Sequence, residues 1–472
     1  MYQSFIGLEI HIQLLTESKV FCGCTNRFGD EPNTNVCPVC MGYPGVLPAL
    51  NAQAIRLSYV VARALNCEMS PQAVFERKNY FYPDMPKNYQ ISQFSSPLGR
   101  NGWIDVAYNG KTRRVRIHEI HLEEDAGKMI HAGDMSLLDY NRAGTPLLEI
   151  VTEPDMEFGE EAEILLQDFR RTIRYLGVCD GNMEEGSMRC DANVSVNLEG
   201  RGLGRKVEIK NLNSSRFVKM ALNYEIGRQK EILDKGGKVV QETRLWNENR
   251  DVTETMRTKE SAHDYRYFPE PDLPAFVPDA EFLAQVDRGL VELPAARRER
   301  FVKDYGVNEA AADFLINEKG TADFYEEVAA LGADPGAAAS WLQFDVRKIL
   351  NRENRELAGS PLTAARLAQL LSLLSGGRIH GKIAKQVLEA VFAEDKDPGL
   401  IIREKGWEQM DDAAELAALV DRALAANAKA AAAVKAGDAK PLGFLVGQIM
   451  KATQGRAQPQ MVQELLKEKL GI

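Results

Sequence analysis

Polar and apolar residues alternate along several stretches of the N-terminal part of the chain, and this alternation predicts β-strands. The clearest stretch runs from Gly7 to Leu14, where Glu9, His11 and Gln13 fall on one face and four aliphatic residues on the other. Side chains two positions apart on a strand lie about 7 Å apart on the same side. The first predicted strand therefore presents a carboxylate beside an imidazole.

Two further predicted strands carry carboxylates among aliphatic side chains. Within Ile117–Asp125, Glu124 shares a face with Ile120 and Leu122, and within Thr145–Glu153 the same holds for Glu149 between aliphatic neighbours. A carboxylate that faces an apolar interior is costly unless a cation, a metal ion or a hydrogen-bond donor meets it. Both acids are therefore candidate functional residues.

Together these three strands predict a site for a hard divalent cation, formed by Glu9, His11, Glu124 and Glu149. Magnesium is favoured because it prefers oxygen ligands and is often shared with substrate phosphates. Each acid taken singly also fits an ordinary paired residue of a strand. Three such strands in one chain favour the metal site.

A later pair of strands offers a polar surface of mixed charge. Met188–Val196 alternates cleanly and places Arg189 and Asp191 on its polar face. Lys206–Ser214, which carries Lys210, is predicted to pair with it in antiparallel fashion across a glycine-rich turn. Cross-strand ion pairing explains part of this pattern.

Helical spacing of apolar residues predicts helices over Ala49–Leu65, Gly159–Leu176 and Phe217–Lys235. From about Leu293 the alternation stops, and the chain is predicted to continue as successive amphipathic helices. The reactive centre is therefore expected in the first 290 or so residues.

The last segment, Lys440–Ile472, has five Lys or Arg against two Glu and is predicted to be a small basic helical module, although a solvated helix is an equally good interpretation. An alanine-rich helix before it is expected to end in a hinge at Gly437. Gly376–Ile383 nearly matches a phosphate-binding loop, but an isoleucine follows Lys382 and a helical run precedes the motif. We predict a turn between two helices there.

The segment Arg77–Gln93 interleaves cations, amides and aromatic residues around two prolines. One interpretation is a loop packed on the core by its rings. The other is a surface that binds phosphate, ribose or base through cations and stacking. The spacing alone leaves both open.

Four of the seven cysteines are paired in a pattern typical of a zinc site: Cys22, Cys24, Cys37 and Cys40. Four protein ligands would close the coordination shell, so the zinc is expected to be structural. Cys67, Cys179 and Cys190 are expected to be small core residues.

Composition narrows the class of protein further. The chain has 472 residues, which suggests about three domains, and a net charge of -10 with a pI near 5.4 excludes a general polyanion binder. Contact with nucleic acid must then come from local basic surface. No signal peptide or long apolar run is present, so a cytoplasmic protein without a membrane partner is expected.

Several motifs resemble the GatB family, one of the subunits of the tRNA-dependent amidotransferases, along the whole chain: GLEIHIQL, VCPVC, RKNYFYPDMPKNYQISQ, HLEEDAGK, DYNRAGTPLLEIVTEPD, KVEIKNLNS and GFLVGQIMKA. The resemblance implies an α+β fold with a cradle domain of mixed, largely antiparallel sheet at 1–292, a helical domain at 293–403 and a tRNA-binding helical tail at 404–472. It also implies conversion of Asp-tRNA(Asn) or Glu-tRNA(Gln) to the amide form, with ATP and Mg²⁺ used to phosphorylate the esterified side chain.

The resemblance implies that the magnesium position falls on Glu9, His11, Glu124 and Glu149. The zinc knuckle, which some relatives lack, matches the four paired cysteines. From face and charge, Arg189 and Lys210 are expected to neutralise the transferred phosphoryl group, with Asp191 beside them in the ATP site: Arg189, Asp191 and Lys210.

Partners follow from the same resemblance and from what the sequence does not contain. No serine-rich amidase signature and no cysteine–histidine nucleophile is evident, so an amidase-type glutaminase subunit is expected to supply ammonia, with a small third subunit in the complex. Two other classes remain open: a free-standing ATP-dependent carboxylate–amine ligase, and a non-enzymatic zinc-containing tRNA-binding scaffold.

Overall fold

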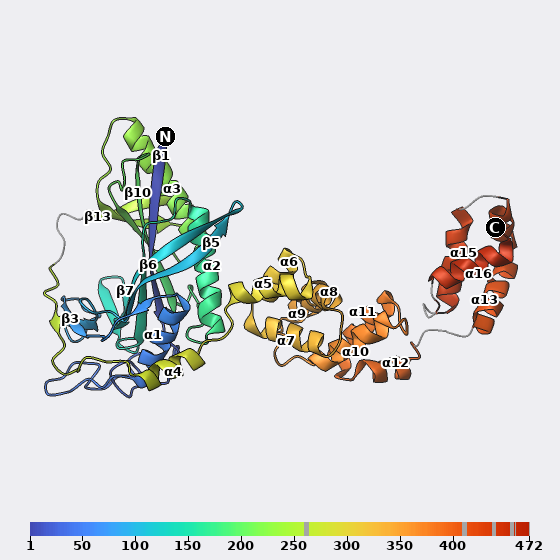
Figure 1. The fold of residues 1–472 in the computed structure, drawn as a ribbon, viewed down its shortest axis with the longest axis horizontal. Helices are drawn as coiled ribbons and strands as arrows, with labels where there is room; N and C mark the ends of the chain where they lie inside the picture. Colours follow the sequence, from blue (N-terminus) through green and yellow to red (C-terminus); the bar gives the residue numbers. More distant parts are fainter. Residues whose placement is uncertain (259–263, 408–412, 437–439, 454–456, 458, 472) are drawn as a thin grey trace. The chain divides into compact units, whose positions relative to one another are not determined.

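The chain divides into two compact units, Met1–Pro294 and Ala295–Ile472, in a computed structural model that describes residues 1–258, 264–407, 413–436, 440–453, 457 and 459–471. The first unit combines a large sheet with helices, and the second is helical in its described residues (Figure 1). The fold is α+β, as the sequence predicted.

A nine-stranded sheet, largely antiparallel, forms the centre of the first unit, in the order β13-β12-β11-β10-β1-β9-β6-β5-β2. Only the β11–β12 pair among these is parallel. The strands span β1 Tyr2–Gln13, β2 Glu68–Met69, β5 Gly99–Tyr108, β6 Lys111–Glu124, β9 Pro146–Thr152, β10 Met188–Leu198, β11 Val207–Lys210, β12 Glu242–Asn247 and β13 Val252–Thr258.

The core of the first unit lies on the apolar face of this sheet. Leu8, Ile10 and Ile12 of β1 are fully buried there, as the alternation predicted. Three helices pack in the same core: α1 (Ala52–Ala64), α2 (Gly159–Tyr175) and α3 (Ser215–Asp234). The polar face of the central strands is thereby left to carry the functional side chains.

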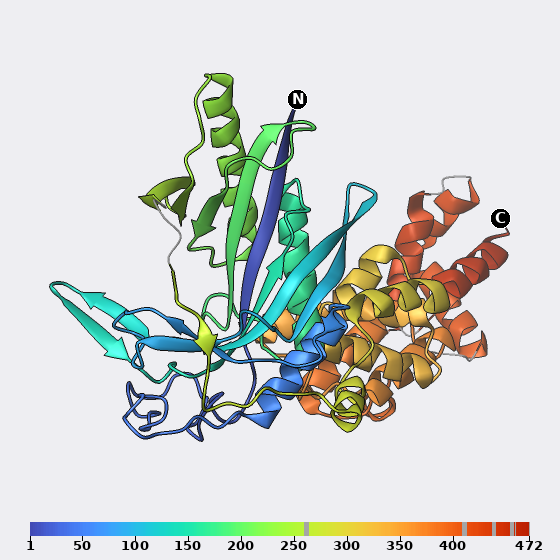
Figure 2. The ribbon, with the colours of Figure 1, turned by 60° about the vertical axis from the view of Figure 1, so that its left-hand side comes forward.

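Two smaller sheets accompany the large one. β14 (Phe268–Pro269), β3 (Glu76–Asn79) and β4 (Tyr89–Ser92) form one of them. β7 (Lys128–Ala132) and β8 (Met135–Asp139) form a separate hairpin that extends from the first unit (Figure 2). A short helix, α4 (Ala280–Arg288), packs against α1 near the end of the unit.

The second unit contains two separate hydrophobic cores, one from Phe301 to Ile402 and one from Leu416 to Leu470. The predicted boundary near residue 403 stays a prediction, which this separation supports. The elements are α5 Pro294–Tyr305, α6 Glu309–Leu315, α7 Lys319–Ala330, α8 Pro335–Ser340, a π-helical turn Trp341–Val346, α9 Arg347–Glu353, α10 Ala364–Ser375, α11 Gly381–Glu394, α12 Pro398–Lys405, α13 Ala413–Ala426, α14 Ala428–Lys435, α15 Lys440–Ala452 and α16 Pro459–Leu470.

The predicted elements are confirmed with small shifts of their ends. The motif that resembles a phosphate-binding loop joins α10 to α11, so the prediction of a turn between two helices is also confirmed. The hinge residue Gly437 and the tail residue Arg456 lie outside the described residues. None of the helices in the described part of the chain is both long and apolar enough to cross a bilayer.

Candidate functional site

A row of three functional side chains crosses the centre of the large sheet. On β1, His11 lies directly opposite Glu149 of β9, and on the other side Glu149 lies opposite His121 of β6. Residues directly opposite one another in an antiparallel pair point to the same face. The register therefore brings residues that are more than a hundred positions apart to one place.

Glu9, His11 and Glu149 form the tightest group of potential metal ligands on this face. One ligand atom from each lies within 4.8 Å of the others. His11 Nε2 is 3.5 Å from Glu149 Oε2 and 3.9 Å from Glu9 Oε1. These separations suit groups that share one cation, since two ligands at about 2.1 Å from a metal lie roughly 3 to 4 Å apart. The donor set fits a hard divalent ion.

The charges in this group are strongly coupled. Burial lowers the pKa of His11, but the hydrogen bond and charge of Glu149, followed by Glu123 and Glu9, outweigh it and raise that pKa to about 9. Burial and the charge of Glu149 raise the pKa of Glu9. Without a metal ion, the protonated imidazole is therefore the cation that the carboxylates share.

Glu124 does not join this group, which corrects the proposed ligand set. It is buried on the opposite, apolar face of β6, where Lys87 Nζ donates to its Oε2 and the backbone N–H of Ile91 donates to its Oε1 at 2.9 Å. The cost of burying this carboxylate is thus met by a lysine and not by a metal ion. Glu123, its neighbour, turns to the polar face and lies 4.0 Å from His11.

Lys78 of β3 is a functional residue that the sequence did not single out by itself. Burial lowers its pKa, but the charges of Glu123, Tyr267 and Glu149 raise that pKa above its ordinary value. Its ammonium also lies 5.1 Å from the ring centre of Tyr265. A buried cation therefore faces the acidic group, and its place in the mixed segment Arg77–Gln93 was the available signal.

That segment combines both of the structures left open by its sequence. Arg77 is held as part of the core by two hydrogen bonds to the buried Glu270, at 2.6 and 2.8 Å. Phe94, just after it, is exposed and stacks on Tyr267 with ring centres 4.5 Å apart. The loop is anchored on one side and offers rings and Lys78 beside the polar face on the other.

The predicted residues of β10 and β11 lie on the same face as His11. Arg189 is opposite His11 and Asp191 is opposite Glu9. Arg189 Nη2 donates to the buried Asp125 at 2.7 Å, and Lys210 donates to Asp191. The three residues thus form an array of paired charges next to the acidic group.

Unpaired polar atoms are concentrated around this face. Among the described residues, four buried side-chain atoms here have no hydrogen-bond partner: Gln93 Nε2, His121 Nε2, Arg189 Nε and Asn193 Oδ1. Buried polar groups are normally paired, because an unpaired one costs about 1–3 kcal/mol. Their concentration is an independent indication that a polar ligand binds here.

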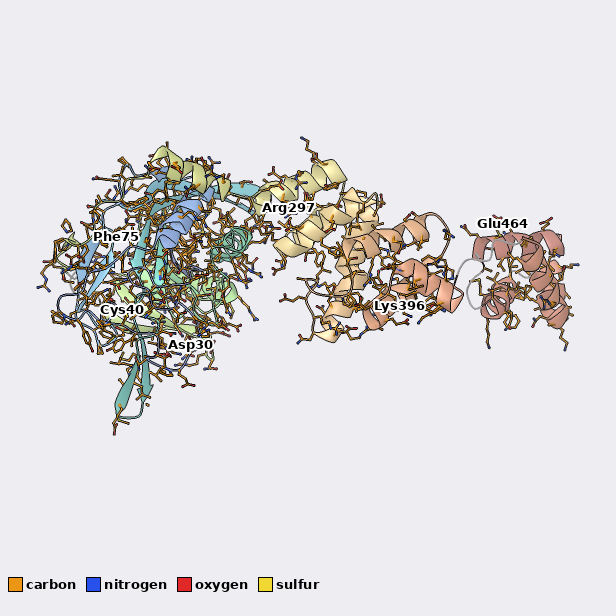
Figure 3. The ribbon with its side chains drawn as sticks, turned by 90° about the horizontal axis from the view of Figure 1, so that it is seen from below. Asp30, Cys40, Phe75, Arg297, Lys396 and Glu464 are labelled. Atoms are coloured by element: carbon orange, nitrogen blue, oxygen red, sulfur yellow. The ribbon has the colours of Figure 1, made fainter. Side chains whose placement is uncertain are left out.

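The four paired cysteines come together in the loop after β1. One sulfur atom from each lies within 4.8 Å of the others, as the tetrahedral set of a zinc site requires; Cys40 is labelled in Figure 3. Hydrogen bonds from Cys22 and from the backbone of Cys37, with the charge of buried Lys19, lower the pKa of Cys40 to about 4 although burial raises it. The donor set fits Zn²⁺, and the other three cysteines are buried, as predicted.

The fold and this site define the class of protein. Residues 4–284 match the family model described as "GatB/GatE catalytic domain", and residues 323–470 match the "GatB domain". The catalytic model covers all the strands of the row, and the second covers most of the helical unit.

Curated relatives cover the chain from end to end. A protein of Carboxydothermus hydrogenoformans is 50% identical over 99% of both chains, and one of Solidesulfovibrio magneticus is 49% identical over 100% of this chain and 99% of its own. A Thermoanaerobacter protein is 48% identical over 99% of both. All three are named as the GatB subunit of aspartyl/glutamyl-tRNA(Asn/Gln) amidotransferase, and the chain belongs to this family.

Proposed function

We propose that this chain is the subunit of a glutamine-dependent amidotransferase that converts Asp-tRNA(Asn), Glu-tRNA(Gln) or both to the amide forms. Family membership over the full length supports the substrate class. The observation that carries the chemistry is the group of Glu9, His11 and Glu149 in the middle of a polar sheet face. This group suits ATP-dependent activation of a carboxylate.

The reaction has two steps. The esterified side-chain carboxylate attacks the γ-phosphorus of ATP, so an acyl phosphate forms and ADP leaves. Ammonia then attacks the acyl carbon, and inorganic phosphate leaves. A magnesium ion held by Glu9, His11 and Glu149 would neutralise phosphate charge in the first step. Glu123 lies at the edge of the same group.

The cations of the chain have complementary roles in this proposal. Lys78 faces the acidic group from β3 and is placed to bind a phosphoryl oxygen. Arg189 keeps one edge on Asp125, so its orientation is fixed while its Nε is unpaired. Lys210 is oriented by Asp191, and this pair is the proposed ATP-binding edge of the site.

Partners and location belong to the same proposal. The cysteines, all of which lie in the described part of the chain, are either clustered or buried, so none resembles an accessible thiol nucleophile for glutamine hydrolysis. We therefore assign ammonia supply to an amidase-type glutaminase subunit, accompanied by a small third subunit. The tail at 404–472 would bind tRNA, the zinc would be structural, and the complex would act in the cytoplasm.

The decisive experiment is tRNA-dependent ATP hydrolysis by the complex with its glutaminase partner. Glu149→Gln should lower this rate by about 10² or more, because a ligand of the transferred phosphoryl group's counter-ion is lost. Glu153→Gln is the matched control, since Glu153 follows on the same segment and pairs with the exposed His118. Its rate should stay close to that of the wild type.

The other classes give different results in this assay. A free-standing ligase would hydrolyse ATP with free aspartate or glutamate and without tRNA. A scaffold would bind tRNA but would keep the same ATP rate after Glu149→Gln. Either result would overturn the proposal.

A further inference from the structure

A second glutamate–isoleucine–histidine triplet lies across β9 from the first one. Glu9-Ile10-His11 on β1 and Glu119-Ile120-His121 on β6 have the same sequence. Both strands pair with β9 in antiparallel register, and Glu9 and Glu119 both lie opposite Val151. Because the two histidines both lie opposite Glu149, the triplets flank this one carboxylate on its two sides.

The distances on the two sides of Glu149 match closely. His11 Nε2 is 3.5 Å from Glu149 Oε2, and His121 Nε2 is 3.8 Å from Glu149 Oε1. Within the triplets, the glutamate-to-histidine distances are 3.9 Å at His11 and 4.0 Å at His121. Each oxygen of Glu149 therefore faces its own histidine and glutamate.

The second histidine is oriented as a metal ligand would be. His121 Nδ1 lies 3.0 Å from the carbonyl oxygen of Gln93, and since a carbonyl can only accept, Nδ1 carries a proton. Histidines that bind metals commonly fix their ring in this way, with the other nitrogen left for the ion. His121 Nε2 is buried and makes no hydrogen bond.

Hydrogen bonding within the group cannot replace a cation at this nitrogen. Distances of 3.8 and 4.0 Å from Nε2 to the two carboxylates are too long for a hydrogen bond but suit two ligands of one ion. The second oxygen of Glu119 is occupied, because Arg100 Nε lies 3.5 Å from it. That contact holds Glu119 with its first oxygen turned to His121.

The charges point the same way. Three carboxylates of this face, Glu119, Glu123 and Glu149, surround His121 and Lys78, and Glu9 adds a fourth beyond His11. One divalent ion at His11 leaves the His121 side with an acidic pair and only an uncommitted imidazole between its members. A second divalent ion would compensate this charge.

We propose that the chain binds a second divalent cation of the magnesium or manganese type through His121 and Glu119, with Glu149 as the carboxylate that bridges it to the ion at Glu9 and His11. Paired ions about 3.5 to 4 Å apart are a known arrangement for phosphoryl transfer. The inference rests on the proposed function for its chemical purpose, but its test does not depend on activity.

The test is manganese binding to the full-length, nucleotide-free chain, followed by electron paramagnetic resonance. Mn²⁺ is a hard ion that will not compete for the cysteine site. The wild type should bind two ions with a spin-coupled spectrum, because a bridging carboxylate holds them close together. His121→Asn should lose one of the two ions and give the hyperfine spectrum of an isolated ion.

His118→Asn is the matched control. His118 lies on the same strand, is exposed and pairs with Glu153, so this variant should keep both ions and their coupling. Glu119→Gln repeats the test at a more exposed position, in case His121→Asn does not fold. It should also give one uncoupled ion.

Two results would overturn the inference: a single uncoupled ion in the wild type, or a coupled pair that persists in both variants. If the wild type binds one ion while Glu149→Gln still abolishes tRNA-dependent ATP hydrolysis, the second cation is wrong and the proposed function stands. If the ion pair is found but ATP hydrolysis is independent of Glu149, the proposed function fails by itself.

Discussion

Glu149 is the residue on which the chemistry of this chain depends most. Its two oxygens face His11 and His121, and a buried lysine lies within electrostatic reach. Burial raises the pKa of Glu149, but the hydrogen bond from His11 and the charges of His121, His11 and Lys78 lower it below its ordinary value. The carboxylate therefore stays ionised at neutral pH and is ready to bind a cation.

Glu124 has a different role, and its replacement should show this. Glu124→Gln leaves the Lys87 ammonium buried without a charged partner, which should lower the free energy of unfolding by about 3 kcal/mol. Chemical denaturation of the full chain, followed through the transition of the first unit, measures this loss. Metal binding at Glu149 should be retained in the folded variant.

The double variant Lys87→Met/Glu124→Leu is the control for that prediction. Replacing both charges with apolar groups of similar size removes the unpaired cation, so most of the lost stability should return. If Glu124→Gln instead kept full stability and lost bound Mn²⁺, Glu124 would be a metal ligand after all.

At the scale of elements, the sequence predicted the strands and their faces well. The alternation in β1 and β10 identified the buried aliphatic residues, because a half-buried strand repeats with a period of two. The same parity places Glu124 and His121 on different faces of β6, so Glu124 lies away from the acidic group. The error arose when acids from both faces were assigned to one ligand set.

What the sequence could not provide is the lateral register and the partner of each acid. His11, Glu149 and His121 meet only because β1, β9 and β6 are neighbours in the sheet, and strand order is not written in local patterns. Lys87, the cation beneath Glu124, comes from a loop with no periodicity. The repeated glutamate–isoleucine–histidine triplet was visible from the start and was the one signal for the second side of the group.

The cysteine loop should behave as an independent structural element. Cys37→Ser should reduce bound zinc from one ion per chain to none and expose the loop to proteases, since three ligands no longer close a structural site. Metal analysis and limited proteolysis measure both effects. Cys67→Ala, which changes a buried cysteine outside the cluster, should keep the zinc.

Mn²⁺ binding by the acidic group separates the zinc loop from the chemistry. It should be unchanged in folded Cys37→Ser. A loss of both metals in that variant would mean that the loop is required to form the sheet face.

At the scale of the whole molecule, the two units have separate hydrophobic cores and should differ in stability. Leu367→Ala removes a fully buried side chain of α10 and should destabilise the helical unit by about 3 kcal/mol. Calorimetry should show that one transition moves to lower temperature while the transition of the first unit stays in place. A common shift of both transitions would contradict this prediction.

The position of β1 in the sheet has a consequence for how the protein is made in the cell. β1 is synthesised first, yet it lies between β9 and β10, so both of its edges stay unpaired until the ribosome has passed Leu198. At common elongation rates this takes roughly 10 to 40 s. An apolar strand with two open edges is prone to aggregate, so the nascent chain should depend on chaperones during that interval.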